Sequence, residues 1–432
     1  MNTVDVITMG CSKNLVDSER IVKLFDNAGY VVRHNPENPD SDIIVINTCG
    51  FIGDAKEESI DMILECCQAK RQKRVRAVYV MGCLSERYRD ALPAEIPEVD
   101  GWYGKFDWTK LVADILNRDS LPDNGRPWDR TLSTPPHTAY IKIAEGCNRF
   151  CAFCAIPLIT GRFVSRPIDE ILAEVEDLVN RGVKEFNIIA QDLSSYGLDI
   201  YKKQALAELV DRMAQIKGVE WIRLHYLYPS QFPYDVLDVM AKRKNVCRYL
   251  DIALQHSSDK VLSNMRRHIT SAETDTLLAE IRKKVPGIHL RTTLMVGFPG
   301  EDDAAFDQLC DFVKRQKFER MGAFAYCEEE DTYAARNYKD SISDEIKQTR
   351  LAHIMALQEE IALESNLAKV GQSMRVLVDR ETEDYYIARS EFDSPEVDPE
   401  VLVKKNCKLK TGEFADVKIT SALPFELIAT VL

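Results

Sequence analysis

The chain has 432 residues, of which 45% are hydrophobic and 29% charged, a composition typical of a globular protein with roughly two to four domains. Lys and Arg total 56 against 69 Asp and Glu, and the net charge of −13 excludes nucleic-acid binding through a general excess of positive charge. The sequence has neither an export signal nor an apolar run of about 18 residues, so we expect a cytoplasmic protein without a membrane span. Its twelve cysteines are then expected to be reduced thiols that bind metal or act in catalysis.

Residues 1–125 are predicted to form an α/β domain with parallel strands. Three short apolar runs, Val4–Met9, Ile43–Asn47 and Val75–Met81, alternate with helical stretches. Each run is followed by a cysteine, and these are Cys11, Cys49 and Cys83. Because the carboxyl ends of parallel strands lie along one edge, we expect the three thiols to converge in a metal site. The alternative is that they are small buried residues, as free cysteines commonly are.

A second group of thiols follows an expected buried strand at Ala139–Ala144. Cys147, Cys151 and Cys154 form the motif C-x3-C-x2-C. Zinc modules usually contain paired C-x2-C halves, and no second half lies within 30 residues on either side. Three closely spaced thiolates suit three irons of a 4Fe-4S cluster and leave the fourth iron open to a small molecule. The spacing resembles the signature of radical S-adenosylmethionine enzymes, in which that iron binds the amino and carboxylate groups of S-adenosylmethionine.

Residues 133–365 alternate apolar strand-like runs with amphipathic helical stretches such as Ile168–Asn180 and Ala272–Lys284, which predicts six βα units and a partial barrel. The expected strands are near Ala139–Ala144, Glu185–Ala190, Glu220–Leu227, Tyr249–Leu254, His289–Val296 and Phe318–Tyr326.

Ligands of such barrels collect at the carboxyl ends of the strands. We therefore predict contacts to S-adenosylmethionine at Phe153, Gln191, Gly297, Gly300 and Glu301. The two glycines would allow close backbone approach to a ligand, although a turn that places Glu301 at a helix N-terminus needs no ligand. Phe153 is expected either to flank the adenine or to pack in the core.

Two further assignments stay open. His256 is interpreted as a hydrogen-bonded structural residue, with a proton shuttle as the alternative, and no catalytic side chain is assigned. The remaining six cysteines are expected to be packing residues. They are Cys66, Cys67, Cys247, Cys310, Cys327 and Cys407.

Four segments resemble the methylthiotransferase family, most closely its ribosomal-protein branch, and the resemblance covers nearly the whole chain. The segments are Met9–Glu19, Asn47–Ile52, Gly82–Tyr88 and Glu145–Pro157. The resemblance implies an N-terminal domain in which Cys11, Cys49 and Cys83 hold an auxiliary 4Fe-4S cluster. It also implies a radical S-adenosylmethionine domain whose cluster is held by the Cys147 triplet, and a C-terminal β-barrel called TRAM.

The resemblance also implies the reaction. One S-adenosylmethionine supplies a methyl group to sulfur, another supplies a radical that abstracts hydrogen from carbon, and the auxiliary cluster provides the sulfur. The substrate of the ribosomal-protein branch is the β-carbon of an aspartate in small-subunit ribosomal protein S-twelve. An electron donor such as flavodoxin or ferredoxin is implied as a further partner.

The segment from Ser343 to Lys369 is expected to be a helical strap, and residues 368–432 a small antiparallel β-barrel of OB-like size. The expected strands are Ser373–Val378, Tyr385–Arg389, Val401–Val403, Phe414–Thr420 and Ile428–Leu432. Between Asp379 and Glu400 the sequence has nine acidic residues and two basic ones, Arg380 and Arg389. An acidic face repels phosphate and attracts basic protein, which favours a ribosomal protein over RNA as substrate.

Two alternatives to this function remain. One is a methylthiotransferase that acts on N6-modified adenosine of transfer RNA, which is expected to carry a basic barrel. The other is an iron–sulfur module that binds the ribosome without catalysis.

Overall fold

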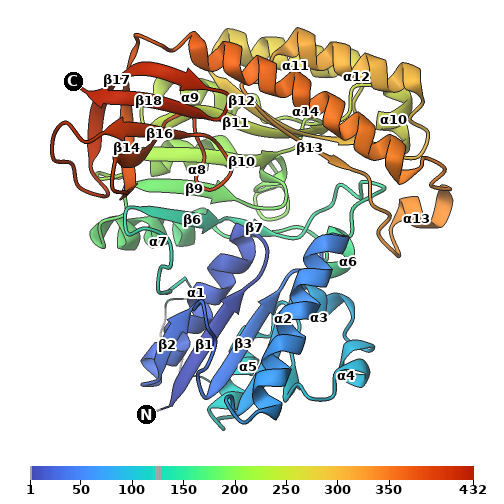
Figure 1. The fold of residues 1–432 in the computed structure, drawn as a ribbon, viewed down its shortest axis with the longest axis vertical. Helices are drawn as coiled ribbons and strands as arrows, with labels where there is room; N and C mark the ends of the chain where they lie inside the picture. The colour runs from blue at the N-terminus through green and yellow to red at the C-terminus, as the bar shows by residue number, and fades with distance from the viewer. Residues whose placement is uncertain (1, 120, 122–125, 127) are drawn as a thin grey trace.

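The computed structural model describes residues 2–119, 121, 126 and 128–432, and within this range a five-stranded sheet, a six-stranded sheet and a closed five-stranded barrel follow one another along the chain (Figure 1). The boundary expected at residue 125 lies outside the described residues. Among the helices of the described chain, none is both long and apolar enough to cross a membrane.

The N-terminal sheet is parallel, in the order β2-β1-β3-β4-β5. Its strands are β1 (Thr3–Thr8), β2 (Val31–His34), β3 (Ile43–Thr48), β4 (Ala77–Gly82) and β5 (Gly101–Trp102). Its helices are α1 (Ser12–Asn27), α2 (Gly53–Arg71), α3 (Cys83–Arg87), α4 (Leu92–Glu95) and α5 (Trp108–Ile115). Helix α2 packs on one face and α1 with α5 on the other, so all six residues of β3 are buried. Burial on both faces explains why the central strands are continuous apolar runs.

The central sheet is a partial barrel of six parallel strands in the order β13-β12-β11-β10-β9-β6, as predicted. These strands are β6 (Thr138–Lys142), β9 (Glu185–Ile189), β10 (Trp221–Leu227), β11 (Val246–Gln255), β12 (His289–Val296) and β13 (Arg320–Ala325). A short antiparallel pair, β7 (Ala144–Glu145) with β8 (Val164–Ser165), follows β6.

Helices cover the outside of this barrel (Figure 1). They are α7 (Ile168–Asn180), α8 (Leu206–Met213), α9 (Asp235–Lys242), α10 (Asp259–Asn264), α11 (Ser271–Lys284), α12 (Asp303–Gln316) and α14 (Asp344–Leu367). Three short helices lie in the loops: α6 (Ile156–Thr160), the 3-10 helix η1 (Leu193–Ser195) and α13 (Tyr333–Asn337). Helix α7 buries Ile168, Ile171, Val175 and Leu178, which recur every three or four residues on one face. In α11 the Thr270 and Glu273 side chains cap the first turn reciprocally.

The C-terminal barrel closes in the order β14-β15-β16-β18-β17. Its strands are β14 (Ser373–Glu381), β15 (Tyr385–Ser390), β16 (Glu400–Lys404), β17 (Phe414–Leu423) and β18 (Glu426–Val431). Four of the pairings are antiparallel, but β16 and β18 pair in parallel. The expectation of an antiparallel barrel therefore misses one pairing. After β16 the chain crosses the barrel to form β17 beside β14. It then returns as β18, which lies between β17 and β16.

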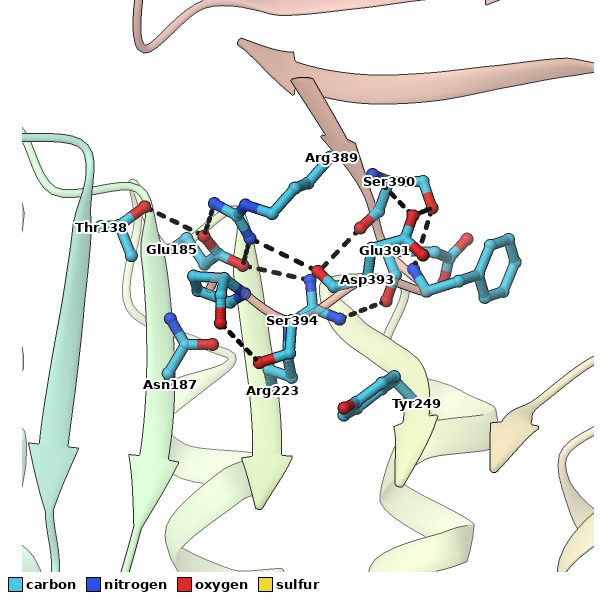
Figure 2. Close-up of polar contacts among 12 residues, drawn as sticks. Thr138, Glu185, Asn187, Arg223, Tyr249, Arg389, Ser390, Glu391, Asp393 and Ser394 are labelled. Carbon is cyan, nitrogen blue, oxygen red and sulfur yellow. Dashed lines mark hydrogen bonds and ion pairs between the residues drawn. The ribbon is translucent and has the colours of Figure 1, made fainter. Parts of the chain in front are cut away.

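The C-terminal barrel docks near the amino ends of the central strands through a buried ionic network (Figure 2). Glu185 accepts hydrogen bonds from Arg389 at 2.7 and 2.9 Å and from Arg223 at 3.1 Å. The loop after β15 continues into the central domain, where Asp393 pairs with Arg320 at 2.6 Å. This end of the central barrel is thus closed by the C-terminal domain, and the opposite end remains for a site.

Most acidic side chains of the segment Asp379–Glu400 form ion pairs, either in this docking contact or within the barrel. Six of its nine carboxylates form ion pairs inside the molecule, and these are Asp379, Glu381, Glu391, Asp393, Asp398 and Glu400. The expectation that the segment presents a free acidic face is therefore not met. Its charge does not by itself indicate a basic partner, because most of that charge is neutralised within the chain.

Candidate metal centre

The first group of thiols lies where three neighbouring strands of the N-terminal sheet end. Cys11 follows β1, Cys49 follows β3 and Cys83 follows β4. The glycines that precede Cys11 and Cys83 have positive φ angles of 87° and 106°. A Cβ at Gly10 would lie 2.8 Å from the Cys49 Sγ, and one at Gly82 would lie 2.6 Å from the Thr48 backbone. Glycine therefore lets the strand ends approach closely enough to gather the three thiols, as the strand order predicts.

The second group of thiols lies in the loop after β7. Gly146 has a φ of 84°, and Phe150, between the first and second thiols, also has a positive φ of 49°. The amide of Cys154 donates to the carbonyl of Cys151 at 3.1 Å, which fixes the tight turn between these thiols. The Cys151 Sγ accepts a hydrogen bond from Arg267 Nη1 at 3.2 Å and lies 3.7 Å from the Tyr228 hydroxyl.

All six thiols line one cavity of about 340 Å³ between the N-terminal domain and the carboxyl ends of the central strands. The two thiol triplets, which are far apart in the sequence, therefore face a single chamber, as the sequence predicts. Aliphatic and aromatic side chains supply most of the wall between them, including Phe51, Phe153, Ile156, Ile159 and Leu227. An apolar wall limits the access of water to whatever binds there.

The chamber disfavours bare thiolates but supplies some positive charge. Burial raises the pKa of both Cys83 and Cys147 to about 12. Desolvation also acts on Cys11, but the Lys13 charge, hydrogen bonds from the Asn14 and Lys13 amides and the Lys105 charge together lower the pKa of that thiol. Buried thiols lose their protons most readily to a bound metal cation.

The thiols fit a polynuclear cluster better than a single ion. Within the part of the chain that the structure describes, no group of three His, Cys, Asp or Glu side chains is arranged to hold one metal ion. In a 4Fe-4S cube each thiolate takes a different iron, so its three protein ligands need not converge on one point. Two soft-ligand triplets that line one cavity are therefore better suited to iron–sulfur clusters than to mononuclear zinc.

A chain of buried charges connects the two domains beside the chamber. Lys105 lines the cavity, and its Nζ lies 3.2 Å from Asp17 and 3.7 Å from Glu145. Asp17 on α1 also pairs with Lys142 on β6 at 2.5 Å. The opposite charges keep the pKa of Asp17 below its ordinary value despite burial. This network holds the N-terminal domain against the first strand of the central barrel.

The residues predicted to contact S-adenosylmethionine fall into two groups. Phe153 and Gln191 line the chamber, and the Gln191 side chain donates to Glu145. Gly297, Gly300 and Glu301 form a turn after β12 whose contacts are internal. The buried Glu301 carboxylate accepts a hydrogen bond from the Gly297 amide at 2.9 Å and pairs with Arg350 at 2.7 Å. These three remain predicted contacts, but the structure gives Glu301 a role in joining the turn to α14.

His256 has the surroundings of a structural histidine. Its side chain is fully buried, its Nε2 lies 3.1 Å from Glu301, and its Nδ1 accepts from the Ser258 amide at 2.9 Å. Both ring nitrogens are thus occupied by residues of the turn after β12 and the loop after β11, which supports the structural interpretation.

Several residues of the chamber were not identified from the sequence. Lys105, Tyr226, Tyr228 and Arg267 all line the cavity, together with Gln255, which the sequence places at the carboxyl end of a barrel strand. Tyr226 and Gln255 belong to the carboxyl ends of β10 and β11, and both have positive φ, at 62° and 72°. Their position at strand ends was a usable signal, whereas Lys105 and Arg267 lie in loops that carry no motif.

Family models match all three parts of the chain. Residues 3–104 match a model described as uncharacterized protein family UPF0004, residues 141–313 match the Radical SAM superfamily, and residues 370–432 match the TRAM domain. Together with the thiol-lined chamber, these matches define the chain as a radical S-adenosylmethionine enzyme, a class that uses an iron–sulfur cluster and S-adenosylmethionine.

Full-length relatives define the family more narrowly. Proteins called "Ribosomal protein uS12 methylthiotransferase RimO" from Phocaeicola vulgatus and Parabacteroides distasonis are each 57% identical to this chain, covering 100% of it and 99% of the relative. A protein of the same name from Porphyromonas gingivalis is 53% identical, with 100% and 99% coverage. The chain belongs to this RimO family of methylthiotransferases.

Solved structures agree on the fold. The radical S-adenosylmethionine methyltransferase TsrM from Kitasatospora setae, solved with cobalamin and a [4Fe-4S] cluster, aligns with a TM-score of 0.56 at 15% identity, over 75% of each chain. The cobalamin-dependent radical enzyme OxsB aligns with a TM-score of 0.52 at 10% identity, over 83% of this chain and 56% of that one. At these identities the likeness concerns the arrangement of the backbone.

Proposed function

We propose that this enzyme inserts a methylthio group at the β-carbon of one aspartate in ribosomal protein uS12, the S-twelve protein of the small subunit. S-Adenosylmethionine would be both the methyl source and the radical source. The names of relatives at 53–57% identity support the substrate. The resemblance that places the target carbon on an aspartate rests on the motifs around the six thiols.

The observation that carries the proposal is the single chamber lined by both thiol triplets. Cys147, Cys151 and Cys154 would hold the cluster of the radical domain, and Cys11, Cys49 and Cys83 would hold a second 4Fe-4S cluster. When bound, the clusters and S-adenosylmethionine supply the electron, the carbon–sulfur cleavage and the sulfur that the reaction requires. Insertion of sulfur at carbon needs both functions within reach of one substrate atom, which a shared chamber provides.

The side chains of the protein would hold and shield these groups. Arg267 and Tyr228 contact the Cys151 Sγ and so orient the middle ligand of the radical-domain cluster. The apolar wall keeps water and stray hydrogen donors away from a reactive carbon radical. Phe153 and Gln191 line the same space and would contact S-adenosylmethionine. The turn with Gly297, Gly300 and Glu301 is not among the lining residues of this cavity and is proposed as a further contact from the position of strand ends alone.

We further propose that the enzyme acts in the cytoplasm, where ribosomal subunits are assembled, and receives electrons from a small carrier such as flavodoxin or ferredoxin. Thiols persist in reduced form in that compartment, where they are free to bind metal.

Anaerobic incubation of the reconstituted enzyme with S-adenosylmethionine, a reductant and either uS12 or transfer RNA tests the proposal. Mass spectrometry should show a methylthio group on one aspartate of uS12 and release of 5′-deoxyadenosine. Modification of the RNA alone would assign the chain to the tRNA branch of this chemistry. Absence of 5′-deoxyadenosine with the clusters fully loaded would indicate a non-catalytic ribosome-binding module.

A further inference from the structure

The chamber contains three cationic side chains, and two of them are engaged by the protein. Lys105 pairs with Asp17 and Glu145. Arg267 donates to the Cys151 Sγ and to the Ala253 carbonyl oxygen. The third cation is Lys13, in the first turn of α1, two residues after the thiol of Cys11.

Lys13 is largely buried, but its ammonium group faces the open space of the chamber and has no counter-ion among the described residues. Its side chain is only 9% exposed, and within the described part of the chain its Nζ has neither an ion pair nor a hydrogen bond. Its contact is with the face of the Tyr226 ring, whose centroid lies 3.3 Å away. The Asp251 carboxylate interacts electrostatically with Lys13, but it already forms an ion pair with the Arg291 guanidinium at 3.5 Å. An ammonium group that faces a mostly apolar cavity without an anion is available to bind one, and an aromatic face replaces only part of its hydration.

The backbone of the central barrel is irregular at Tyr226, the residue whose ring lies against Lys13. Tyr226 has a φ of 62°, in the left-handed region that tyrosine rarely adopts. The pairing of β10 with β11 also shifts register between Leu224 and Leu227, around this residue. Bulges and strained residues that re-aim a side chain are concentrated at functional sites. Lys13 from the N-terminal domain and Tyr226 from the central domain thus form one side of an anion-binding site that faces the chamber.

We infer that Lys13 binds the carboxylate of the substrate aspartate and so selects an acidic side chain for modification. The inference rests on the proposed function. The substrate carboxylate would supply the counter-ion that Lys13 lacks, on the side of the ammonium group opposite the Tyr226 ring. This contact would bring the adjacent β-carbon into the chamber between the two thiol triplets. S-Adenosylmethionine also carries a carboxylate, so the test must distinguish the two sources.

The test compares wild-type holoenzyme with Lys13→Met and Lys13→Arg on uS12 and on uS12 whose target aspartate is replaced by asparagine. Methionine keeps the unbranched stem that packs on Tyr226 but removes the charge. For Lys13→Met we expect kcat/KM for the aspartate protein to fall by about 10- to 100-fold, with the asparagine protein little affected. Lys13→Arg should restore most of the preference. Binding of the aspartate protein to the holoenzyme should weaken along with its kcat/KM, whereas binding of the asparagine protein should change little.

The controls separate this inference from folding and from the proposed function. Lys23→Met, further along α1 and half-buried, should keep the preference for aspartate. Iron content and the concentration of S-adenosylmethionine needed for its cleavage should be unchanged in Lys13→Met. An unchanged aspartate preference in Lys13→Met, or a raised S-adenosylmethionine requirement with unchanged uS12 binding, would overturn the inference. Failure of the wild-type enzyme to modify uS12 while it cleaves S-adenosylmethionine would refute the proposed function and the inference with it.

Discussion

At the scale of single residues, the two thiol triplets differ in the groups that surround them. Cys151 is contacted by Arg267 and Tyr228 of the central domain. Cys83 has Asn14 near its sulfur, at 3.6 Å, and Cys11 lies in the field of Lys13 and Lys105. Each triplet is thus supported by its own domain, which allows the two proposed clusters to be removed separately.

Replacing one thiol in each triplet should therefore separate cleavage of S-adenosylmethionine from transfer of the methylthio group. Cys151→Ala should abolish cleavage of S-adenosylmethionine, whereas Cys49→Ala should keep cleavage but stop transfer of the methylthio group. The measurement is 5′-deoxyadenosine and modified uS12 quantified in the same reaction. Loss of cleavage in both variants would contradict the division of labour.

The sequence predicts these thiols because their chemistry is carried by local spacing and by strand ends. It does not predict Lys105 or Arg267, since their partners lie far along the chain: Lys105 pairs with Asp17, and Arg267 contacts Cys151. Glu301 is the opposite case, in which the sequence points to a ligand contact but the carboxylate has partners within the protein. Its motif indicates a ligand-binding turn, but Arg350 and His256, both distant in sequence, occupy its carboxylate.

At the scale of secondary-structure elements, the docking of the C-terminal barrel depends on Glu185 at the start of β9. This carboxylate is fully buried between Arg389 and Arg223. Long apolar strands were predicted well because periodicity determines them, whereas the short edge strands β2 and β5 were missed. The docking surface was also missed, because an acidic segment looks the same in sequence whether it faces solvent or an arginine.

Glu185→Gln should destabilise the protein by about 3–5 kcal/mol, since it leaves two buried guanidinium groups without their carboxylate. The measurement is the free energy of unfolding in urea. Glu208→Gln on α8, where the glutamate is exposed and paired with Lys203, is the control and should change stability by less than about 0.5 kcal/mol. Equal effects of the two substitutions would show that the network is not stabilising.

The same carboxylate predicts how stability depends on pH. Burial opposes ionisation, but Arg389 and Arg223 lower the pKa of Glu185 from 4.5 to about 2 in the folded protein. Its contribution to stability is therefore present above pH 4.5 and is lost as pH falls from 4.5 towards 2. Unfolding measured across this range should show a smaller loss with acid in Glu185→Gln than in wild type, and parallel curves would contradict the assignment.

At the scale of the whole molecule, the chamber depends on how the N-terminal domain meets the central one. Besides the Asp17 pairs, Glu329 in the loop after β13 accepts Arg87 at 2.7 Å and Lys56 at 2.9 Å. Arg87 also donates to the Gly50 carbonyl at 3.1 Å, next to Cys49. This contact holds one thiol triplet at a set position relative to the other.

Glu329→Gln should therefore uncouple the two halves of the reaction. We expect cleavage of S-adenosylmethionine to continue, while methylthio transfer per cleavage falls by about 10-fold, because small misplacements of reacting groups are costly. The ratio of modified uS12 to 5′-deoxyadenosine measures this. Asp331→Asn, which affects an exposed pair with Arg336 in the same loop, should leave the ratio unchanged. A normal ratio in Glu329→Gln would show that the contact does not position the triplets.

The central claim is that two thiol triplets in one chamber each hold a cluster, and iron and sulfide counting on anaerobically reconstituted protein tests it most directly. We expect about eight irons per chain in wild type and about four in a variant that lacks Cys11, Cys49 and Cys83. Replacing the buried Cys66 or Cys247 by alanine should leave the count at about eight. About four irons in wild type, unchanged when the N-terminal triplet is removed, would contradict the account.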